Sequence, residues 1–228
     1  VAMISMLEQK FEKSRFTRVD SDVIDRLIAK EEHKEANLES NQREILSSVF
    51  RSQLPQIKKV EFNVETQALG ENGAPIMITQ SEYMRRMKEM ANIQAGMSFY
   101  GEMPNMYNLV LNADHKLVKQ VLTDADNSCK AALEPIESEM ASLNNRRKEL
   151  QKAQEGKKTE DIPQAEKDEL NDIEKKISDE TTKKQAVLGE YANGNKIIHQ
   201  LIDLALLQNN MLKGEALTNF VKRSIELI

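Results

Sequence analysis

The chain has 228 residues, of which 39% are hydrophobic, 30% are charged and only 4% are aromatic. A chain of this length can bury a core as one large domain or two small ones, and the composition is typical of a helix-rich protein. Lys and Arg total 32 against 37 Asp and Glu, which gives a net charge of −5 with both signs interleaved. This distribution indicates no basic face, so we expect no nucleic-acid partner.

Cysteine content and apolar runs bear on the location of the protein. Cys129 is the only cysteine in the sequence, which excludes a disulfide framework and agrees with a reducing, cytoplasmic location. The longest strongly apolar run, IIHQLIDLALL (197–207), contains His, Gln and Asp and is too short to span a bilayer. No signal peptide is visible, so we expect no membrane partner. The chain begins with Val rather than Met, which indicates a fragment of a longer protein.

Residues 1–124 are predicted to form an α+β part built on a small mixed sheet. FTRV (16–19) and KKVEFNVET (58–66) alternate apolar and polar residues at the period of a strand. A Gly-Glu-Asn-Gly turn follows the second of these, and we expect APIMIT (74–79) to return beside it as a β-hairpin. A fourth strand is predicted at YNLVL (107–111).

Helices are predicted between these strands. SDVIDRLI (21–28) begins with a capping Ser, and after the last strand Asn112 or Asp114 can cap a further helix. NQREILSSVFRSQL (41–54) has apolar residues at helical spacing, and Pro55 ends it. The residues that this helix should bury are Ile45, Leu46, Val49 and Phe50.

Six of the eleven methionines fall between Thr79 and Met106. Thr79 and Glu82 form a T-x-x-E capping box, so we expect a helix to begin at Gln80 and to carry several methionines on one side. A methionine stripe is more often core than binding surface, but the Gly-containing loop that follows is a poor place for a rigid core. Flexible thioethers suit a surface that adapts to many apolar partners, and we favour that interpretation.

Residues 125–192 are predicted to form an antiparallel coiled-coil hairpin inserted after the α+β part. Two segments place apolar residues at coiled-coil spacing, and a loop with Gly156 and Pro163 separates them. The surrounding Glu, Lys and Asp residues would form its solvated faces. The expected seam consists of Ile136, Met140, Leu143, Leu150, Leu170, Ile173 and Ile177.

Residues 193–228 are predicted to form two dimerisation helices hinged near Gly214. Apolar residues cover an arc of about 200° on the first of them, whereas an ordinary surface helix needs a stripe of roughly 100°. An intermolecular four-helix bundle, with two helices from each copy, would bury the surplus. Alternatively, the hairpin at 125–192 folds back and covers it. For the homodimer, the predicted interface is Ile198, Leu201, Ile202, Ala205, Leu206, Leu217, Phe220, Val221 and Ile225.

Four segments together resemble the C-terminal domain of the HtpG family, the bacterial branch of the ninety-kilodalton heat-shock chaperones. They are FTRVDSDVIDRLI, MRRMKEMA, VLNADHKLVKQVL and LIDLALLQNNMLKGEALTNFVKRSIELI. The resemblance covers residues 7–124 and 193–228, and its most specific feature is the order of the segments. The family usually has Pro where this chain has Ala113, and many members lack the hairpin at 125–192.

This resemblance implies an ATP-dependent chaperone of the stress response whose C-terminal domain is a constitutive homodimer. It also implies that unfolded or partly folded client proteins are partners, held in part by the helix after Gln80. The ATP and Mg site would belong to an N-terminal domain outside this chain, so we expect no cofactor here. By position, the client-contact residues would be Met84, Met87, Met90, Ile93 and Met97.

No catalytic or metal-binding pattern is apparent, so we expect no enzyme activity from this chain itself. His33, His115 and His199 are scattered, and no zinc or phosphate-binding motif occurs. DSDVID matches a calcium loop only in part, because Asp25 stands where that loop requires Gly. The rival interpretation is a purely structural dimer module with buried methionines and no client role.

Overall fold

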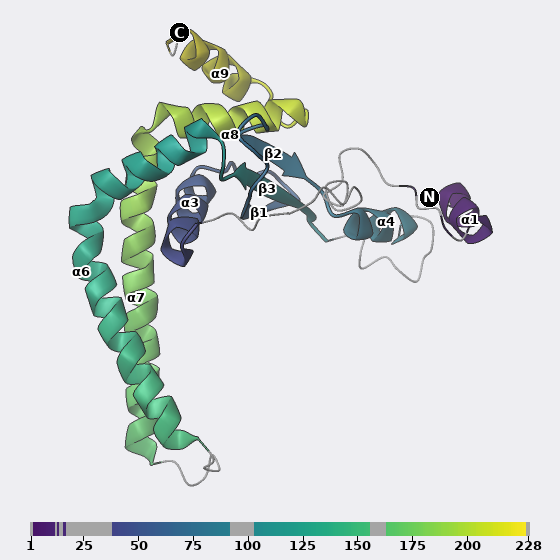
Figure 1. Cartoon of the computed structure of the whole chain (residues 1–228). Helices are drawn as coiled ribbons and strands as arrows, with labels where there is room; N and C mark the ends of the chain where they lie inside the picture. Colours follow the sequence, from purple (N-terminus) through teal and green to yellow (C-terminus); the bar gives the residue numbers. More distant parts are fainter. Residues whose placement is uncertain are drawn as a thin grey trace.

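The computed structural model describes residues 2–11, 13, 16, 38–91, 103–155 and 163–226. Apart from Phe16, the predicted strand and helix within 16–28 lie outside these residues. Figure 1 shows a small α/β core from which two long helices extend to one side, while α1 and α4 lie on the other side. The described residues thus combine helices with a small mixed sheet, which confirms the α+β class.

The strands of the described residues form one three-stranded sheet with the order β1-β3-β2. Strand β3 (Asn105–Asn112) runs parallel to β1 (Val60–Gln67) and antiparallel to β2 (Ile76–Thr79). The strands expected at 58–66 and 74–79 therefore exist. The prediction that they pair with each other as a β-hairpin is wrong, because β3 lies between them.

The loop that follows β1 explains this arrangement. Asn112, at the end of β3, is fully buried. Its Oδ1 accepts a hydrogen bond from the Leu69 amide at 3.1 Å, and its Nδ2 donates to the Gly70 carbonyl at 2.8 Å. The backbone after β1 is thereby fixed to the neighbouring strand rather than turned back on β1, because a buried amide needs all of its partners.

Helix α3 (Ser40–Ser52) confirms the strongest periodic signal of the sequence. The Gln42 side chain accepts from the Glu39 amide at 3.0 Å, which satisfies a free donor at the start of the helix. The helix packs between β1 and α7. Its buried residues are the four predicted ones, Ile45, Leu46, Val49 and Phe50.

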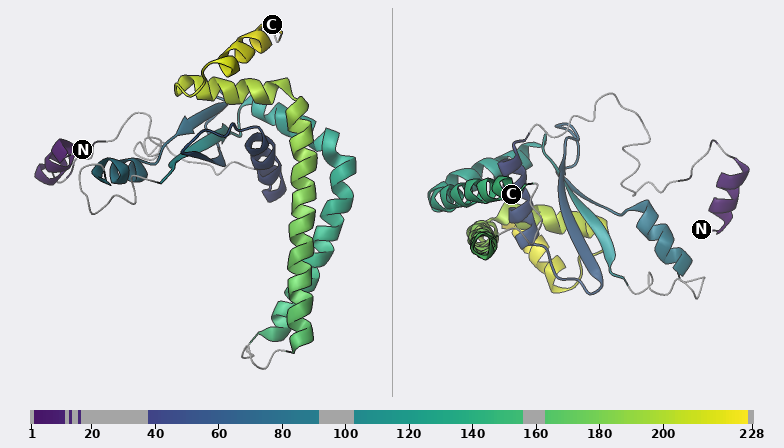
Figure 2. Two further views of the ribbon diagram at one scale, coloured as in Figure 1. Left: turned by 180° about the vertical axis from the view of Figure 1, so that it is seen from behind. Right: turned by 90° about the horizontal axis from the view of Figure 1, so that it is seen from below.

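The two long helices α6 (Lys116–Gln154) and α7 (Gln164–Gly194) run side by side in opposite directions (Figure 2). Helix α6 crosses the predicted boundary at 124/125 without interruption, and its first half lies in the core. It continues through Pro135, which lacks a backbone donor for the turn before it. Of the predicted seam, Leu150 and Ile173 are buried and the others half-buried. Coiled-coil packing and the three-part division stay predictions.

Two helices end the described chain, as predicted: α8 (Lys196–Gln208) and α9 (Glu215–Glu226). Gly214 between them has a φ of +60°, a conformation that favours glycine. Helix α8 lies across β2 and against the near ends of α6 and α7. A single hydrophobic cluster therefore joins α3, the sheet, the first part of α6, the end of α7 and α8.

Candidate functional site

The methionine helix α4 spans Glu82–Ala91 and begins two residues later than predicted. The capping box is wrong, because Thr79 is the last residue of β2 and pairs with Asn108. Gln80 and Ser81, which follow Thr79, are not helical, and the buried Oγ1 of Thr79 has no hydrogen-bond partner among the described residues. Ser81 instead accepts the first helical bond, through its carbonyl and the Arg85 amide.

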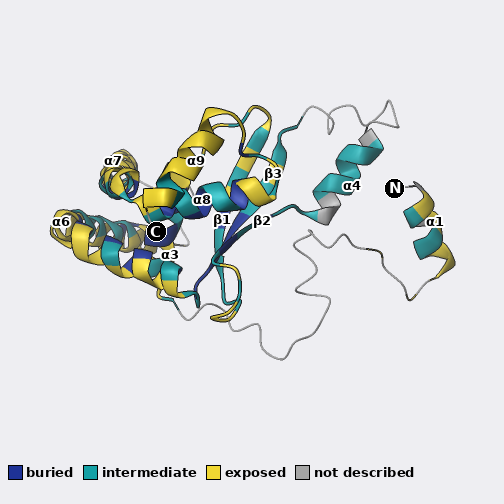
Figure 3. Ribbon diagram, turned by 90° about the horizontal axis from the view of Figure 1, so that it is seen from above, coloured by how far each residue is buried: buried dark blue, intermediate teal, exposed yellow. Residues whose placement is uncertain are grey.

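Helix α4 lies outside the hydrophobic core. Met84, Met87 and Met90 are half-buried, and none of them belongs to the core cluster or packs against it. Figure 3 shows the helix at intermediate burial and away from the buried centre of the molecule. Ile93 and Met97, the other predicted client-contact residues, lie outside the described residues. The three described methionines thus occupy the peripheral position expected of a contact surface.

Polar contacts hold α4 on two sides. Arg86 donates from both of its terminal nitrogens to Glu8 of α1 (Ala2–Lys10), at 2.9 and 3.2 Å, and it also donates to the Phe16 carbonyl. Lys88 donates to the Asn105 side chain at the start of β3, at 2.8 Å. The helix is therefore fixed by directional hydrogen bonds from its charged residues.

Helix α1 contributes apolar surface that the sequence analysis did not identify. Met3 and Met6 are 68% and 60% exposed, and Phe11 and Phe16 are also exposed. The spacing of Met3 and Met6 places them on one side of a helix, which was the available sequence signal. Helix α1 and α4 lie together at the end of the molecule opposite the long helices (Figure 1).

Helix α9 docks on α8 mainly through polar side chains. Arg223 forms an ion pair with Asp203 and donates from Nε to Gln200 at 3.1 Å. Lys196 contacts Glu226 at 2.8 Å, and this partner lowers the pKa of the Glu226 carboxyl. Of its apolar residues, Phe220 packs against the core. A surface helix ordinarily buries its apolar side, so the remaining apolar residues of α9 require another cover.

The predicted dimer residues divide between these two helices. Those on α8 are already buried within the single chain: Ile198, Leu201, Ile202, Ala205 and Leu206. The sheet and the near ends of α6 and α7 cover them. This arrangement is close to the alternative in which the hairpin at 125–192 covers the apolar surface of the first terminal helix. On α9, Leu217, Val221 and Ile225 are exposed, the last by 70%. The dimer contact stays a prediction, and the apolar residues free to form it lie on α9.

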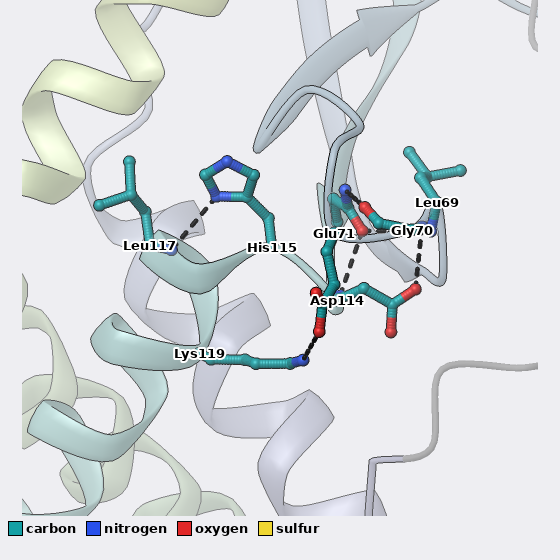
Figure 4. Close-up of polar contacts among 8 residues, drawn as sticks. Leu69, Gly70, Glu71, Asp114, His115, Leu117 and Lys119 are labelled. Atoms are coloured by element: carbon teal, nitrogen blue, oxygen red, sulfur yellow. Dashed lines mark hydrogen bonds and ion pairs between the residues drawn. The ribbon is translucent and has the colours of Figure 1, made fainter.

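The corner between β3 and α6 is structural (Figure 4). The helix cap is His115, whose Nδ1 accepts from the Leu117 amide at 3.2 Å, so the predicted caps Asn112 and Asp114 are wrong. Both of those residues bind the loop after β1 instead, and the Asp114 carboxylate accepts from the Gly70 amide at 2.9 Å. The contacts of Asp114 and His115 thus fix the loop after β1 and the start of α6.

Neither a metal centre nor an activated thiol is found in the part of the chain that the structure describes. It holds no group of three or more His, Cys, Asp or Glu side chains placed to bind an ion. Cys129 is buried in α6, and this burial raises the pKa of its thiol, which disfavours the reactive thiolate. No described helix is long and apolar enough to cross a bilayer.

Known proteins are similar to this chain over its whole length. It is 69% identical over 228 residues to the chaperone protein HtpG of Bacteroides fragilis and 68% identical to that of Bacteroides thetaiotaomicron. It is 45% identical to HtpG of Porphyromonas gingivalis over 99% of its length. The chain belongs to the HtpG family.

The chain spans about a third of the length of these HtpG relatives, 34% for the first two and 33% for the third. No family model and no solved structure matches it. The match to the Bacteroides HtpG proteins includes residues 125–192, so the two long helices belong to the sequence that these relatives share. They are therefore not an insertion peculiar to this chain.

Proposed function

We propose that this chain is the C-terminal dimerisation and client-contact region of an ATP-dependent molecular chaperone. The observation that carries the proposal is the methionine helix α4, which lies outside the core in a chain of the HtpG family. The longer protein would bind and hydrolyse ATP with Mg in a part outside this chain. Its partners would be a second copy and unfolded or partly folded proteins of the cytoplasm, as in a stress response.

The exposed side of α9 supports the dimer. Leu217, Val221 and Ile225 contribute roughly 1.5–3 kcal/mol each when fully buried, which is on the order of 10 kcal/mol for a symmetric pair. This gain from burial is comparable with the free-energy cost of association, which is about 4–15 kcal/mol, so it can offset that cost. The sequence continues with Leu227 and Ile228, which extend the apolar set. A C₂ contact through α9 would cover the residues that the single chain leaves in water.

The three methionines of α4 support the client contact. Thioether side chains are flexible and polarizable, so they adapt to apolar segments of differing shape. A surface that must hold many unrelated proteins requires this adaptability. Met84, Met87 and Met90 can accommodate such segments without loss of core packing, because they are not part of the core.

Replacement of the three methionines tests the client role. In Met84→Ser/Met87→Ser/Met90→Ser, we expect the midpoint of thermal unfolding to stay within about 3 °C of the parent, since the core is unchanged. Suppression of the aggregation of a heat-unfolded model enzyme, measured by light scattering, should fall at least severalfold. Met106→Ser on β3 is the control, because Met106 is exposed but lies outside α4.

A purely structural dimer module predicts the opposite result. If the triple variant loses substantial thermal stability, the methionines are core residues and the client role is contradicted. If stability and suppression of aggregation are both unchanged, α4 does not contact clients and the chain acts only in dimerisation.

A further inference from the structure

Charged side chains attach α4 to its neighbours. None of the α4 residues whose burial the structure describes joins the hydrophobic cluster, so the packing of Met84, Met87 and Met90 does not fix the helix on the core. Within the described residues, its charged side chains make the contacts to other elements: Lys88 to Asn105 of β3, and Arg86 to α1. Figures 1 and 2 show α1 beside α4 and remote from the rest of the molecule.

The contact with α1 links Arg86 with Glu8 and Phe16. Two nitrogens of Arg86 bind the two carboxylate oxygens of Glu8 at 2.9 and 3.2 Å. The same guanidinium donates to the Phe16 carbonyl, while the Phe16 amide donates to Glu8 at 2.9 Å. The side chains of Arg86 and Glu8 are only 25% and 20% exposed.

This geometry is specific for arginine. A guanidinium presents parallel donors that match both oxygens of one carboxylate, and further donors remain for a carbonyl. A lysine ammonium in its place is a point charge and cannot reproduce the planar fork. Partial burial also shields the pair from water and salt more than an exposed ion pair.

We propose that Arg86 is a positioning residue, which holds the methionine helix α4 against α1 through Glu8 and Phe16. It fixes the direction of Met84, Met87 and Met90 and keeps Met3 and Met6 of α1 at the same end of the molecule. The part of this inference that concerns clients rests on the proposed function. The part that concerns the position of α4 does not.

Hydrogen exchange measured by mass spectrometry on the full 228-residue chain tests the positioning role. In Arg86→Glu, two carboxylates face each other, so exchange in the peptide covering 82–91 should rise about tenfold. Glu8→Arg should act likewise. The charge-swapped variant Glu8→Arg/Arg86→Glu should restore at least half of the protection, and Arg86→Lys should give an intermediate value because it keeps the charge but loses the fork.

Arg146→Glu is the matched control. Arg146 lies on the long helices, where it contacts the carboxylates of Glu149 and Glu169, and its reversal changes the net charge by the same amount as Arg86→Glu. We expect it to leave exchange in 82–91 unchanged. Exchange that is unaltered in Arg86→Glu, or that the charge swap fails to restore, would overturn the positioning role.

Binding of a fluorescent unfolded model protein to the same variants separates this inference from the proposed function. We expect affinity to fall in Arg86→Glu and to recover with the charge swap, in parallel with exchange. If exchange behaves as expected while affinity stays constant across the set, the positioning role stands and the client role of α4 is contradicted.

Discussion

Helices α8 and α9 are neighbours in sequence and both are amphipathic, yet they use their apolar sides differently. Helix α8 places Ile198, Leu201, Ile202 and others in the core of its own chain. Helix α9 has no buried residue among those described and docks through polar contacts together with the half-buried Phe220. An apolar stripe shows that a surface must be covered, but it does not show whether the same chain or another one covers it.

Helix α4 resembles α9, because its described apolar residues are also not covered by the core of the same chain. It is amphipathic, lies outside the core cluster and is attached by charged side chains. Substitutions in α8 should therefore change folding stability, whereas substitutions in α4 and α9 should change association. The following variants test that division.

The largest effect on stability is expected in α8. Leu206 is 1% exposed, so Leu206→Ala should lower the free energy of unfolding by about 2–5 kcal/mol through lost burial and a cavity. Its neighbour Leu207 is 36% exposed, and Leu207→Ala should cost less than about 1 kcal/mol. Urea unfolding measures both. Similar values for the two variants would show that α8 is not part of the core.

The next effect concerns α9. Ile225→Glu would place a charge at the most exposed apolar residue of the proposed contact, so the dimer dissociation constant should rise about 100-fold or more. Sedimentation equilibrium measures the constant, and circular dichroism should show an unchanged helix content. Asn219→Glu adds the same charge on another side of the helix and should leave the constant within about threefold. An Ile225→Glu variant that dimerises normally would place the contact elsewhere.

A smaller effect is expected where α7 joins the core. Lys184 is buried and contacts Glu44 at 3.1 Å and Glu137 at 3.2 Å, which links α7 to α3 and α6. Lys184→Met keeps the packing of the side-chain stem, and the half-exposed Glu44 carboxylate can regain water, so the loss should be about 1–2 kcal/mol, most of it from the buried Oε1 of Glu137. Lys183→Met, an exposed neighbour, should cost below about 0.5 kcal/mol.

The smallest effect is a pH dependence of the α8–α9 contact. The hydrogen bond from Lys196 lowers the pKa of Glu226 below its ordinary value of 4.5. The contribution of this pair is therefore fully present above that ordinary value and is lost as pH falls through the lowered pKa of the folded state. After correction for intrinsic rates, exchange of α9 amides should be constant from neutral pH down to the ordinary pKa of a Glu carboxyl and should rise as pH falls through the lowered pKa of Glu226. Lys196→Met should remove this transition.

The sequence predicted features that depend on local periodicity. Ile45 and Phe50 were correctly placed in the core, and a helix was correctly expected on each side of Gly214. Prediction from the sequence failed where contact with a residue distant in the chain decides the local structure. Asn112 holds the loop that was predicted to close a hairpin, and Thr79 ends a strand although its neighbours fit a capping box.

The candidate site shows the same limit. The methionines of α4 were found from composition and resemblance, because both are visible in one short segment. The contact between Arg86 and Glu8 joins residues 78 positions apart, and no sequence spacing predicts it. The docking side of α9 was also not predictable, since the wheel of a helix gives an apolar side but not its orientation in the fold.

Sedimentation velocity of the unmodified chain at micromolar concentrations tests whether α9 carries an association surface. A folded particle of twice the 26.0 kDa chain mass, which dissociates when Ile225 is replaced by Glu, is the predicted result. A well-folded 26.0 kDa particle with no heavier species at any concentration would contradict it.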